Sequence, residues 1–209
     1  ESRSLNREEM KTLINKLVDA CLPPNERRKM RDLTSNELFH YVEPRHQKPL
    51  IEPVWELGSA VYRHRLVHLE YQKTNGEITH AVVKPVGIMC SEYYFYLIAY
   101  IGDNDKKYPG YPTVYRIDRI REFKVTEEGF EIPYKDRFEE GEFRKRIPFM
   151  YGGKLHKTTF TYTGPDINAV LDRLPTAVAK KQEDGSYLVT VEVYGEKGLA
   201  MWLRGQEVD

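Results

Sequence analysis

Hydrophobic and polar residues follow two different periods along this chain, and the period changes close to residue 65. Between residues 6 and 20, apolar side chains recur at the i, i+3, i+4, i+7 spacing of an amphipathic helix. Asn6 and Glu9 stand three residues apart at its start, which is the spacing of a capping box. The pattern predicts a helix over residues 6–20.

Prolines divide the next part of the chain. Pro23–Pro24 ends the first helix, and a second short, charged helix is expected over residues 25–32, capped by the asparagine that opens it. An extended arm follows over residues 45–53, and its final proline suits the first position of a third helix. Residues 1–53 therefore predict a helical connector.

From residue 65 onward the hydrophobic period is two, as in β-strands. Asn75–Gly76 is a strong pattern for a type I′ hairpin turn, and a polar loop is expected over residues 102–112. Short strands joined in this way predict a small five-stranded barrel over residues 54–126. The strands are expected at residues 65–72, 77–89, 93–101 and 115–120, with residues 121–125 continuing the sheet.

Residues 127–150 are rich in charge and predict a linker that contains a short helix. The pattern then changes to β-α-β-β-α, with Asp184–Gly185 as a hairpin turn. Residues 151–209 therefore predict a separate α+β extension, and the whole chain predicts the α+β class. The elements of the extension are expected at residues 154–162, 165–174, 177–181, 187–193 and 197–203.

The most informative residues lie in two consecutive predicted strands. The segment Tyr94–Tyr100 has no charge and is rich in aromatic residues, so it predicts a strand buried on both faces. Residues 115–120 alternate strictly, which places Arg116 and Arg119 on opposite faces of a strand. Guanidinium groups beside ring faces suit a phosphate, a base or a nucleotide.

The order of these motifs resembles the WYL-domain family, which is named for a Trp-Tyr-Leu triplet. Phe95–Leu97 matches the triplet, with Phe in place of Trp. A strand ending in Tyr71 and a Pro-x-Gly element at Lys84–Gly87 precede it, and Arg116–Ile120 follows. The resemblance spans residue 54 to the end of the chain. Three downstream segments resemble the extension that accompanies these domains: Phe149–Gly153, Val170–Leu174 and Met201–Leu203.

The resemblance implies an Sm-like barrel that senses an effector within a DNA-binding transcriptional regulator. The family pairs this barrel with a winged helix-turn-helix, and the opening helices of this chain lack that pattern. The first residue is Glu1 rather than Met, so we expect a fragment whose duplex-DNA-binding domain lies upstream. The expected partners are a nucleotide or single-stranded nucleic-acid effector and a second copy of the chain in a homodimer.

Six residues are candidates for the ligand or nucleic-acid site. Arg119 is the preferred phosphate contact because it shares a strand face with Tyr115, and Arg116 comes second. The alternative for both arginines is a surface salt bridge with Asp118 or Glu122. Tyrosines in a barrel are usually core residues, and a lone lysine is usually solvated. The candidates are Arg119, Arg116, Tyr96, Lys84, Tyr71 and His80.

Charge and composition limit the other function classes. Thirty-two basic and thirty-two acidic residues cancel, so any contact with nucleic acid must come from a local patch. Cys21 and Cys90 form neither a disulfide framework nor a metal motif, which favours a reducing cytoplasmic setting. His64 and His68 straddle the start of a strand and should not converge on a metal. The sequence has no membrane-span, signal-peptide, enzyme or cofactor motif, so we expect no membrane association, catalysis or cofactor.

Two other functions remain open. In the first, the aromatic-basic face of the barrel docks a protein partner and binds no small ligand. Such a face would be flat and apolar, whereas an effector site needs a concave cluster of an arginine with Tyr96 and Lys84. The second is a standalone RNA-binding barrel, and the zero net charge argues against its broad affinity for nucleic acid.

Overall fold

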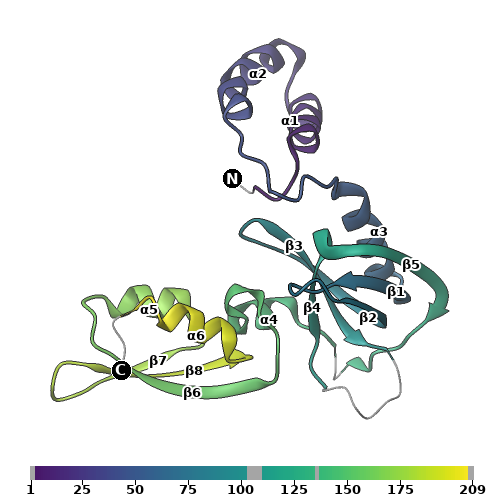
Figure 1. The fold of residues 1–209 in the computed structure, drawn as a ribbon. Helices are drawn as coiled ribbons and strands as arrows, with labels where there is room; N and C mark the ends of the chain where they lie inside the picture. Colours follow the sequence, from purple (N-terminus) through teal and green to yellow (C-terminus); the bar gives the residue numbers. More distant parts are fainter. Residues whose placement is uncertain (1–2, 103–109, 135–136, 207–209) are drawn as a thin grey trace.

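The computed structural model describes residues 3–102, 110–134 and 137–206 (Figure 1). Helices come first, a five-stranded antiparallel sheet follows, and a smaller unit of helices and three strands comes last. This arrangement confirms the predicted α+β class. Most of the predicted polar loop lies outside the described residues. The N-terminal helices are α1 (Arg7–Cys21), α2 (Pro24–Phe39) and α3 (Ile51–Tyr62).

The Glu9 carboxylate caps the starts of two helices. The Asn6 side chain accepts a hydrogen bond from the Glu9 backbone N–H at 2.9 Å, and the Asn6 N–H donates to the Glu9 carboxylate at 3.4 Å. These two bonds confirm the predicted capping box. The other carboxylate oxygen of Glu9 accepts from the backbone N–H groups of Leu50 and Ile51, at 2.6 and 2.7 Å. Glu9 therefore fixes the start of α1 against the start of α3.

Helix α2 is longer than the local pattern predicts. Its N-cap is Pro23 rather than Asn25, and it continues to Phe39, about two turns beyond the predicted end. The guanidinium of Arg7 donates to the carbonyl oxygen of Leu38 at 2.6 Å, which satisfies one of the free carbonyls at the end of α2. The donor comes from α1, so the sequence of α2 alone does not encode this ending.

The central sheet is open among the described residues. Its strands follow the order β4-β3-β2-β1-β5, and no hydrogen-bonded pairing joins the two edge strands β4 and β5 in the part of the chain that the structure describes. The five predicted strands are present, but closure into a five-stranded Sm-like barrel is not confirmed. The strands are β1 (Arg65–Gln72), β2 (Ile78–Ser91), β3 (Tyr94–Ile101), β4 (Thr113–Arg116) and β5 (Ile120–Gly129).

A short 3₁₀ helix, η1 (Ile117–Arg119), joins β4 to β5. The prediction of one continuous strand through this segment is therefore wrong at its centre. Ile117 enters the main core, and the Asp118 side chain turns back to accept hydrogen bonds from Arg116. These contacts replace strand pairing. Because a 3₁₀ helix repeats every three residues, the strict alternation that placed Arg116 and Arg119 on opposite faces is lost.

The predicted hairpin turn at Asn75–Gly76 is present, but it is not type I′. The Lys73 carbonyl accepts a hydrogen bond from the Gly76 N–H at 3.0 Å. Gly76 has φ +86°, whereas Asn75 does not have a positive φ. A type I′ turn needs positive φ at both central residues, so glycine alone takes the left-handed conformation here.

Strand β3 is buried on both faces, as its uncharged sequence predicts. Leu97 lies in the core cluster that Leu57 of α3 also enters. Ile98, its neighbour, points the other way and belongs to the cluster that contains Phe143 of α4 (Glu140–Arg146). Burying a large apolar side chain contributes about 1.5–3 kcal/mol, so one strand holds α3 on one face and α4 on the other.

The C-terminal unit has the predicted β-α-β-β-α order. Its three strands follow the antiparallel order β6-β8-β7. Within the described residues, no helix of the chain has both the length and the apolar character needed to cross a membrane. After α4 the elements are η3 (Pro148–Met150), β6 (Leu155–Tyr162), α5 (Ile167–Arg173), β7 (Val178–Lys181), β8 (Tyr187–Tyr194) and α6 (Lys197–Leu203).

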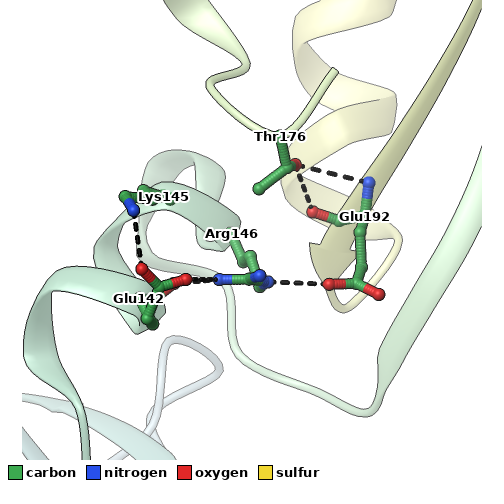
Figure 2. A network of polar contacts seen from close by, with 5 residues as sticks. All are labelled: Glu142, Lys145, Arg146, Thr176 and Glu192. Atoms are coloured by element: carbon green, nitrogen blue, oxygen red, sulfur yellow. Dashed lines mark hydrogen bonds and ion pairs between the residues drawn. The ribbon is translucent and has the colours of Figure 1, made fainter. Parts of the chain in front are cut away.

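A polar network fixes α4 against the C-terminal sheet (Figure 2). The Arg146 guanidinium donates to the Glu142 carboxylate at 2.6 Å and to the Glu192 carboxylate of β8 at 2.8 Å. Lys145 binds the other oxygen of Glu142 at 2.6 Å. The Thr176 hydroxyl donates to the backbone carbonyl of Glu192 at 2.8 Å. Arg146 therefore bridges a helix that packs on the central sheet and a strand of the C-terminal sheet.

This network predicts a stability change in acid. Hydrogen bonds from Lys145 and Arg146 lower the pKa of Glu142 from 4.5 to about 2. Because the folded-state pKa is lowered, the contribution of Glu142 to the free energy of unfolding is complete above about pH 4.5 and is lost as pH falls toward about 2. Between about pH 5 and pH 2, we expect Tm measured by circular dichroism to fall more steeply for the wild type than for Glu142→Gln. The exposed Glu183→Gln is the control, and equal slopes for the wild type and Glu142→Gln would contradict this prediction.

Candidate functional site: a basic-aromatic cluster

Rings and guanidinium groups gather at the N-terminal end of β3. Tyr94 and Tyr96 lie two residues apart and so share one face of the strand. Arg116 of β4 pairs directly with Tyr96 in the sheet register, which places it on the same face. We call the whole group the basic-aromatic cluster. Its members are Arg3, His46, Tyr93, Tyr94, Tyr96 and Arg116.

The Arg116 guanidinium is held in a fixed position. Its central carbon lies 3.4 Å from the centre of the Tyr94 ring. Its Nε and Nη2 donate to the two carboxylate oxygens of Asp118, at 3.0 and 2.7 Å. The backbone N–H of Arg116 donates to the Tyr71 hydroxyl at 3.3 Å. Asp118 uses two of the five N–H donors of the guanidinium, so the fork is oriented before any ligand arrives.

Asp118 is the buried partner of this pair. Only 7% of the residue is exposed, and the Lys48 ammonium donates to its backbone carbonyl at 2.7 Å. Burial lowers the pKa of Arg116, but its hydrogen bonds and ion pair with Asp118 outweigh burial and raise that pKa overall. The guanidinium therefore stays charged beside the rings.

Arg3 forms a second guanidinium–ring pair next to the first. Its guanidinium carbon lies 5.0 Å from the centre of the Tyr93 ring, and its Nε donates to the Val42 carbonyl at 2.8 Å. The Tyr93 and Tyr94 ring centres are 6.5 Å apart, and the rings are nearly perpendicular. Tyr93 is 46% exposed, so one ring of the cluster is open to solvent. One guanidinium thus lies over each of these two neighbouring rings.

Burial favours the neutral form of two side chains in the cluster. Burial lowers the pKa of His46, whose ring centre lies 6.5 Å from that of Tyr94. Its Nδ1 accepts from the Lys48 backbone N–H at 3.0 Å, so the proton resides on Nε2. Nε2 is buried and has no hydrogen-bond partner among the described residues. Burial raises the pKa of Tyr96 to about 12, so its hydroxyl remains a hydrogen-bond donor.

The structure brings together only some of the six predicted site residues. Arg116 and Tyr96 are paired, and the Tyr71 hydroxyl contacts the backbone of Arg116. Lys84 pairs with Tyr100, four residues along β3 from Tyr96, which is a distance of about 13 Å. The predicted concave cluster that includes both arginine and Lys84 is therefore not formed.

Arg119 lies apart from the rings of the cluster. Its guanidinium donates to the Thr74 hydroxyl at 2.7 Å, beside the β1–β2 turn. The preference for Arg119 assumed a continuous strand shared with Tyr115, and that assumption is wrong because η1 interrupts the strand. Whether either arginine contacts a ligand stays a prediction.

A concave feature lies over β1 and its neighbours. It is a groove of about 940 Å³, and both Tyr71 and His80 line it. Tyr115 and Phe123 contribute aromatic walls. The Tyr71 and Tyr115 rings pack edge to face, with centres 5.1 Å apart. Tyr71 therefore belongs to the groove through its ring and contacts the basic-aromatic cluster through its hydroxyl.

Sequence reasoning missed four members of the cluster, Arg3, His46, Tyr93 and Tyr94, and one of them had a recognisable pattern. Tyr94 shares a face with Tyr96 by the period of two, so it was predictable as a neighbour of Arg116. Arg3 and His46 come from the connector, and no spacing in the sequence places them beside β3. Only the packing of residues far apart in sequence brings them there.

The geometry predicts different stability effects for the two arginines. Arg116→Gln removes a fork onto a buried carboxylate, so we expect the free energy of unfolding to fall by about 1.5–3 kcal/mol. Arg119→Gln removes one bond to an exposed hydroxyl, and we expect a change within about 0.5 kcal/mol. Urea denaturation of both variants measures the difference. A larger loss for Arg119→Gln than for Arg116→Gln would be inconsistent with this geometry.

Comparisons with known proteins place these elements in a family. Residues 54–125 match the family model described as the WYL domain. Among solved structures, proteasome accessory factor B/C (PafBC) of Arthrobacter aurescens aligns with 94% of this chain and 29% of its own, at 18% identity and a TM-score of 0.40. A CRISPR Cas-related protein aligns with 79% of this chain and 44% of its own, at 14% identity and a TM-score of 0.40. No curated protein matches.

The chain thus spans less than half the length of either solved structure. The family match covers α3 and the sheet as far as Val125 of β5. It includes the Phe95–Leu97 triplet and the Arg116–Ile120 segment that carry the resemblance in the sequence. Residues 54–125 of this chain are therefore a WYL domain.

Proposed function

We propose that this chain is the effector-binding part of a DNA-binding transcriptional regulator. In this proposal the basic-aromatic cluster binds a nucleotide-like or single-stranded nucleic-acid ligand. The observation that carries it is the Arg116 guanidinium, which Asp118 holds 3.4 Å above the Tyr94 ring. A fixed guanidinium can pair with a phosphate, and the neighbouring exposed ring of Tyr93 can stack with a base.

The charges of the cluster favour a ligand with a phosphate backbone. Arg3 and Arg116 of the cluster, with Lys48 beside it, contribute three cations, and the carboxylate of Asp118 pairs with Arg116. The chain as a whole has no net charge, so attraction must come from this local excess. Three N–H donors of the Arg116 guanidinium remain after Asp118 is bound. These donors can face a phosphate without breaking the existing ion pair.

Unpaired bases suit this site better than a duplex. Tyr93 and Tyr94 offer ring faces, and stacking on a ring requires a base that is not paired and stacked within a helix. The cluster also lies on a strand end and a connector, rather than on a helix that can enter a major groove. Single strands and free nucleotides are therefore the preferred ligands.

The position of the cluster suggests how binding acts on an upstream domain. Arg3 and His46 come from the connector, whereas Tyr94 and Arg116 come from the sheet. A ligand that contacts both parts binds more tightly when the connector lies in one position against the sheet than when it lies in another. That difference in affinity shifts the population toward the tighter-binding position. We propose that this shift biases a DNA-binding domain that precedes the connector.

A second candidate function is protein interaction, and a separate surface favours it. Helices α1 and α3 border a groove of about 700 Å³ that is lined mostly by apolar side chains, including Leu13 and Ile51. Trp55 and Tyr62 of α3 are 76% and 86% exposed. Large exposed aromatic residues of this kind are typical of interfaces. We propose that this groove contributes to a homodimer.

The ligand proposal predicts a preference for single strands. We expect fluorescence anisotropy to show tighter binding of a short labelled single-stranded oligonucleotide than of the same sequence as a duplex. Arg116→Gln should weaken single-strand binding about ten- to a hundredfold, because it removes a charge-assisted contact. Tyr93→Leu should weaken it about five- to a hundredfold by removing one stacking face.

Tyr134→Leu is the matched control for this experiment. Tyr134 is also exposed and also lies beneath a guanidinium, that of Arg137, but it is not part of the cluster. Its replacement should leave affinity unchanged. Duplex affinity equal to or greater than single-strand affinity would refute the proposal.

The dimer proposal predicts a molecular mass near twice 24.6 kDa by light scattering at protein concentrations on the order of tens of micromolar. Tyr62→Glu places a charge in the exposed apolar surface and should shift the mass toward the monomer. The control is Leu188→Glu, which changes a partly exposed leucine of the C-terminal sheet. A single 24.6 kDa species for the wild type would exclude the dimer at these concentrations.

A further inference from the structure

We propose a second ligand site, for a phosphoryl anion, at the junction of the WYL domain with the C-terminal unit. A pocket of about 190 Å³ lies between the β2–β3 turn, the end of α4 and the end of α5. Its lining includes three cationic side chains and a single carboxylate. None of its lining residues belongs to the basic-aromatic cluster. The residues that carry the proposal are Glu92, Arg144, Lys145, Phe149 and Arg173.

Arg173 is the least engaged cation of this pocket. Its guanidinium carbon lies 4.7 Å from the centre of the Phe149 ring. Its nearest carboxylate oxygen, on Glu92, is 3.8 Å away, and both side chains are about half exposed. Arg173 donates no hydrogen bond to any other described residue. The ring therefore orients a guanidinium whose N–H donors remain available for an anion.

The other two cations enter the pocket from α4. Arg144 donates to the Cys90 carbonyl at 3.3 Å and to the Glu140 carboxylate at 2.9 Å. Lys145 binds Glu142 at 2.6 Å. Neither Glu140 nor Glu142 lines the pocket, so their carboxylates hold the cations from outside. An anion inside the pocket meets three cations and the Glu92 carboxylate directly, and the carboxylates of Glu140 and Glu142 partly neutralise Arg144 and Lys145 from outside.

The helix ends further reduce the positive charge of the pocket. Both α4 and α5 end at the pocket, and a helix C-terminus carries at most about half a negative charge. Each helix has only seven residues, which makes its dipole smaller still. The positive potential of the pocket therefore comes chiefly from Arg173, which has no carboxylate within hydrogen-bond distance among the described residues. An anion beside Arg173 can accept hydrogen bonds from its available N–H donors.

The backbone around the pocket is strained. Five non-glycine residues of the described chain have positive φ, and three of them line this pocket: Glu92, Phe149 and Met150. The left-handed conformation is unfavourable for residues with a Cβ, and such strain concentrates at functional sites. Here one of the residues with positive φ, Phe149, is also the one whose ring lies beneath the Arg173 guanidinium. This clustering is an observation independent of the charges.

The size of the pocket limits the ligand. About 190 Å³ is less than the roughly 300 Å³ at which pockets for drug-sized molecules begin. A single phosphoryl group fits this volume, whereas the sugar and base of a nucleotide would have to remain outside it. Because the walls come from the WYL sheet, α4 and the C-terminal unit, a bound phosphoryl group would link all three.

Isothermal titration calorimetry of the full chain with inorganic phosphate, at constant ionic strength, tests the proposal. We expect saturable binding with Kd on the order of millimolar or tighter, and chloride should not compete. Arg173→Gln should weaken binding about tenfold or more, and Arg173→Lys should restore only part of it because lysine lacks the fork. Both variants should keep the wild-type Tm, since the side chain is half exposed.

Arg137→Gln is the matched control. Arg137 is 47% exposed, lies over a tyrosine ring and pairs with a glutamate, as Arg173 does with its own partners, but it is outside the pocket. Its replacement should leave phosphate affinity unchanged. Absence of binding up to about 10 mM phosphate, or equal losses in the Arg173 and Arg137 variants, would overturn the proposal.

A second titration with adenosine monophosphate identifies the source of the phosphoryl group. Affinity equal to that of phosphate, with the same loss in Arg173→Gln, would support a site that recognises the phosphoryl group alone. Tighter binding that Arg173→Gln also weakens would support the site and assign its ligand to nucleotides. Binding of the nucleotide that Arg173→Gln leaves unchanged would overturn the assignment to this pocket.

Discussion

Burial of strand β3 on both faces is the constraint on which the arrangement of this molecule depends. The strand has no charged residue, so each face needs an apolar cover. Helix α3 covers one face through Leu57, and α4 covers the other through Phe143. Tyr94, at the N-terminal end of the strand, is only partly buried. The basic-aromatic cluster forms there because the polar connector, rather than a helix, lies over that end of the strand.

The parts of the fold that were predicted correctly are those that local sequence encodes. The capping box of Asn6 with Glu9 and the alternation of the strands each depend on residues only a few positions apart. The turn η1 was missed because its cause is tertiary, since Ile117 is pulled into the core and Asp118 is bound by Arg116. The alternation of side chains over residues 115–120 is compatible with a continuous strand as well as with η1, so the sequence alone could not reveal this turn.

The candidate site also has a part that local sequence encodes and a part that it does not. Arg116 and Tyr96 lie in adjacent strands, so their meeting follows from the hairpin register. Lys84 shares their face but lies too far along the sheet, and a motif match does not give a position along a strand. Arg3 and His46 reach the cluster only because the connector packs against the end of β3. That packing joins residues more than forty positions apart in the sequence, and no helix or strand period relates residues so far apart.

The two proposed sites meet at one residue. Tyr96 is paired with Arg116 on one side and with Met89 on the other, and Met89 lines the phosphoryl pocket. The charges of Arg116, in the cluster, and Glu92, in the pocket, both act on the pKa of Tyr96, so this residue is electrostatically coupled to both sites. Two anionic ligands repel one another, whereas ordering of the shared strand end by the first ligand lowers the entropy cost of the second. Whichever effect is larger, thermodynamic linkage makes it reciprocal. If an anion in the pocket changes the affinity of the cluster for its ligand by some factor, that ligand changes the affinity of the pocket for the anion by the same factor.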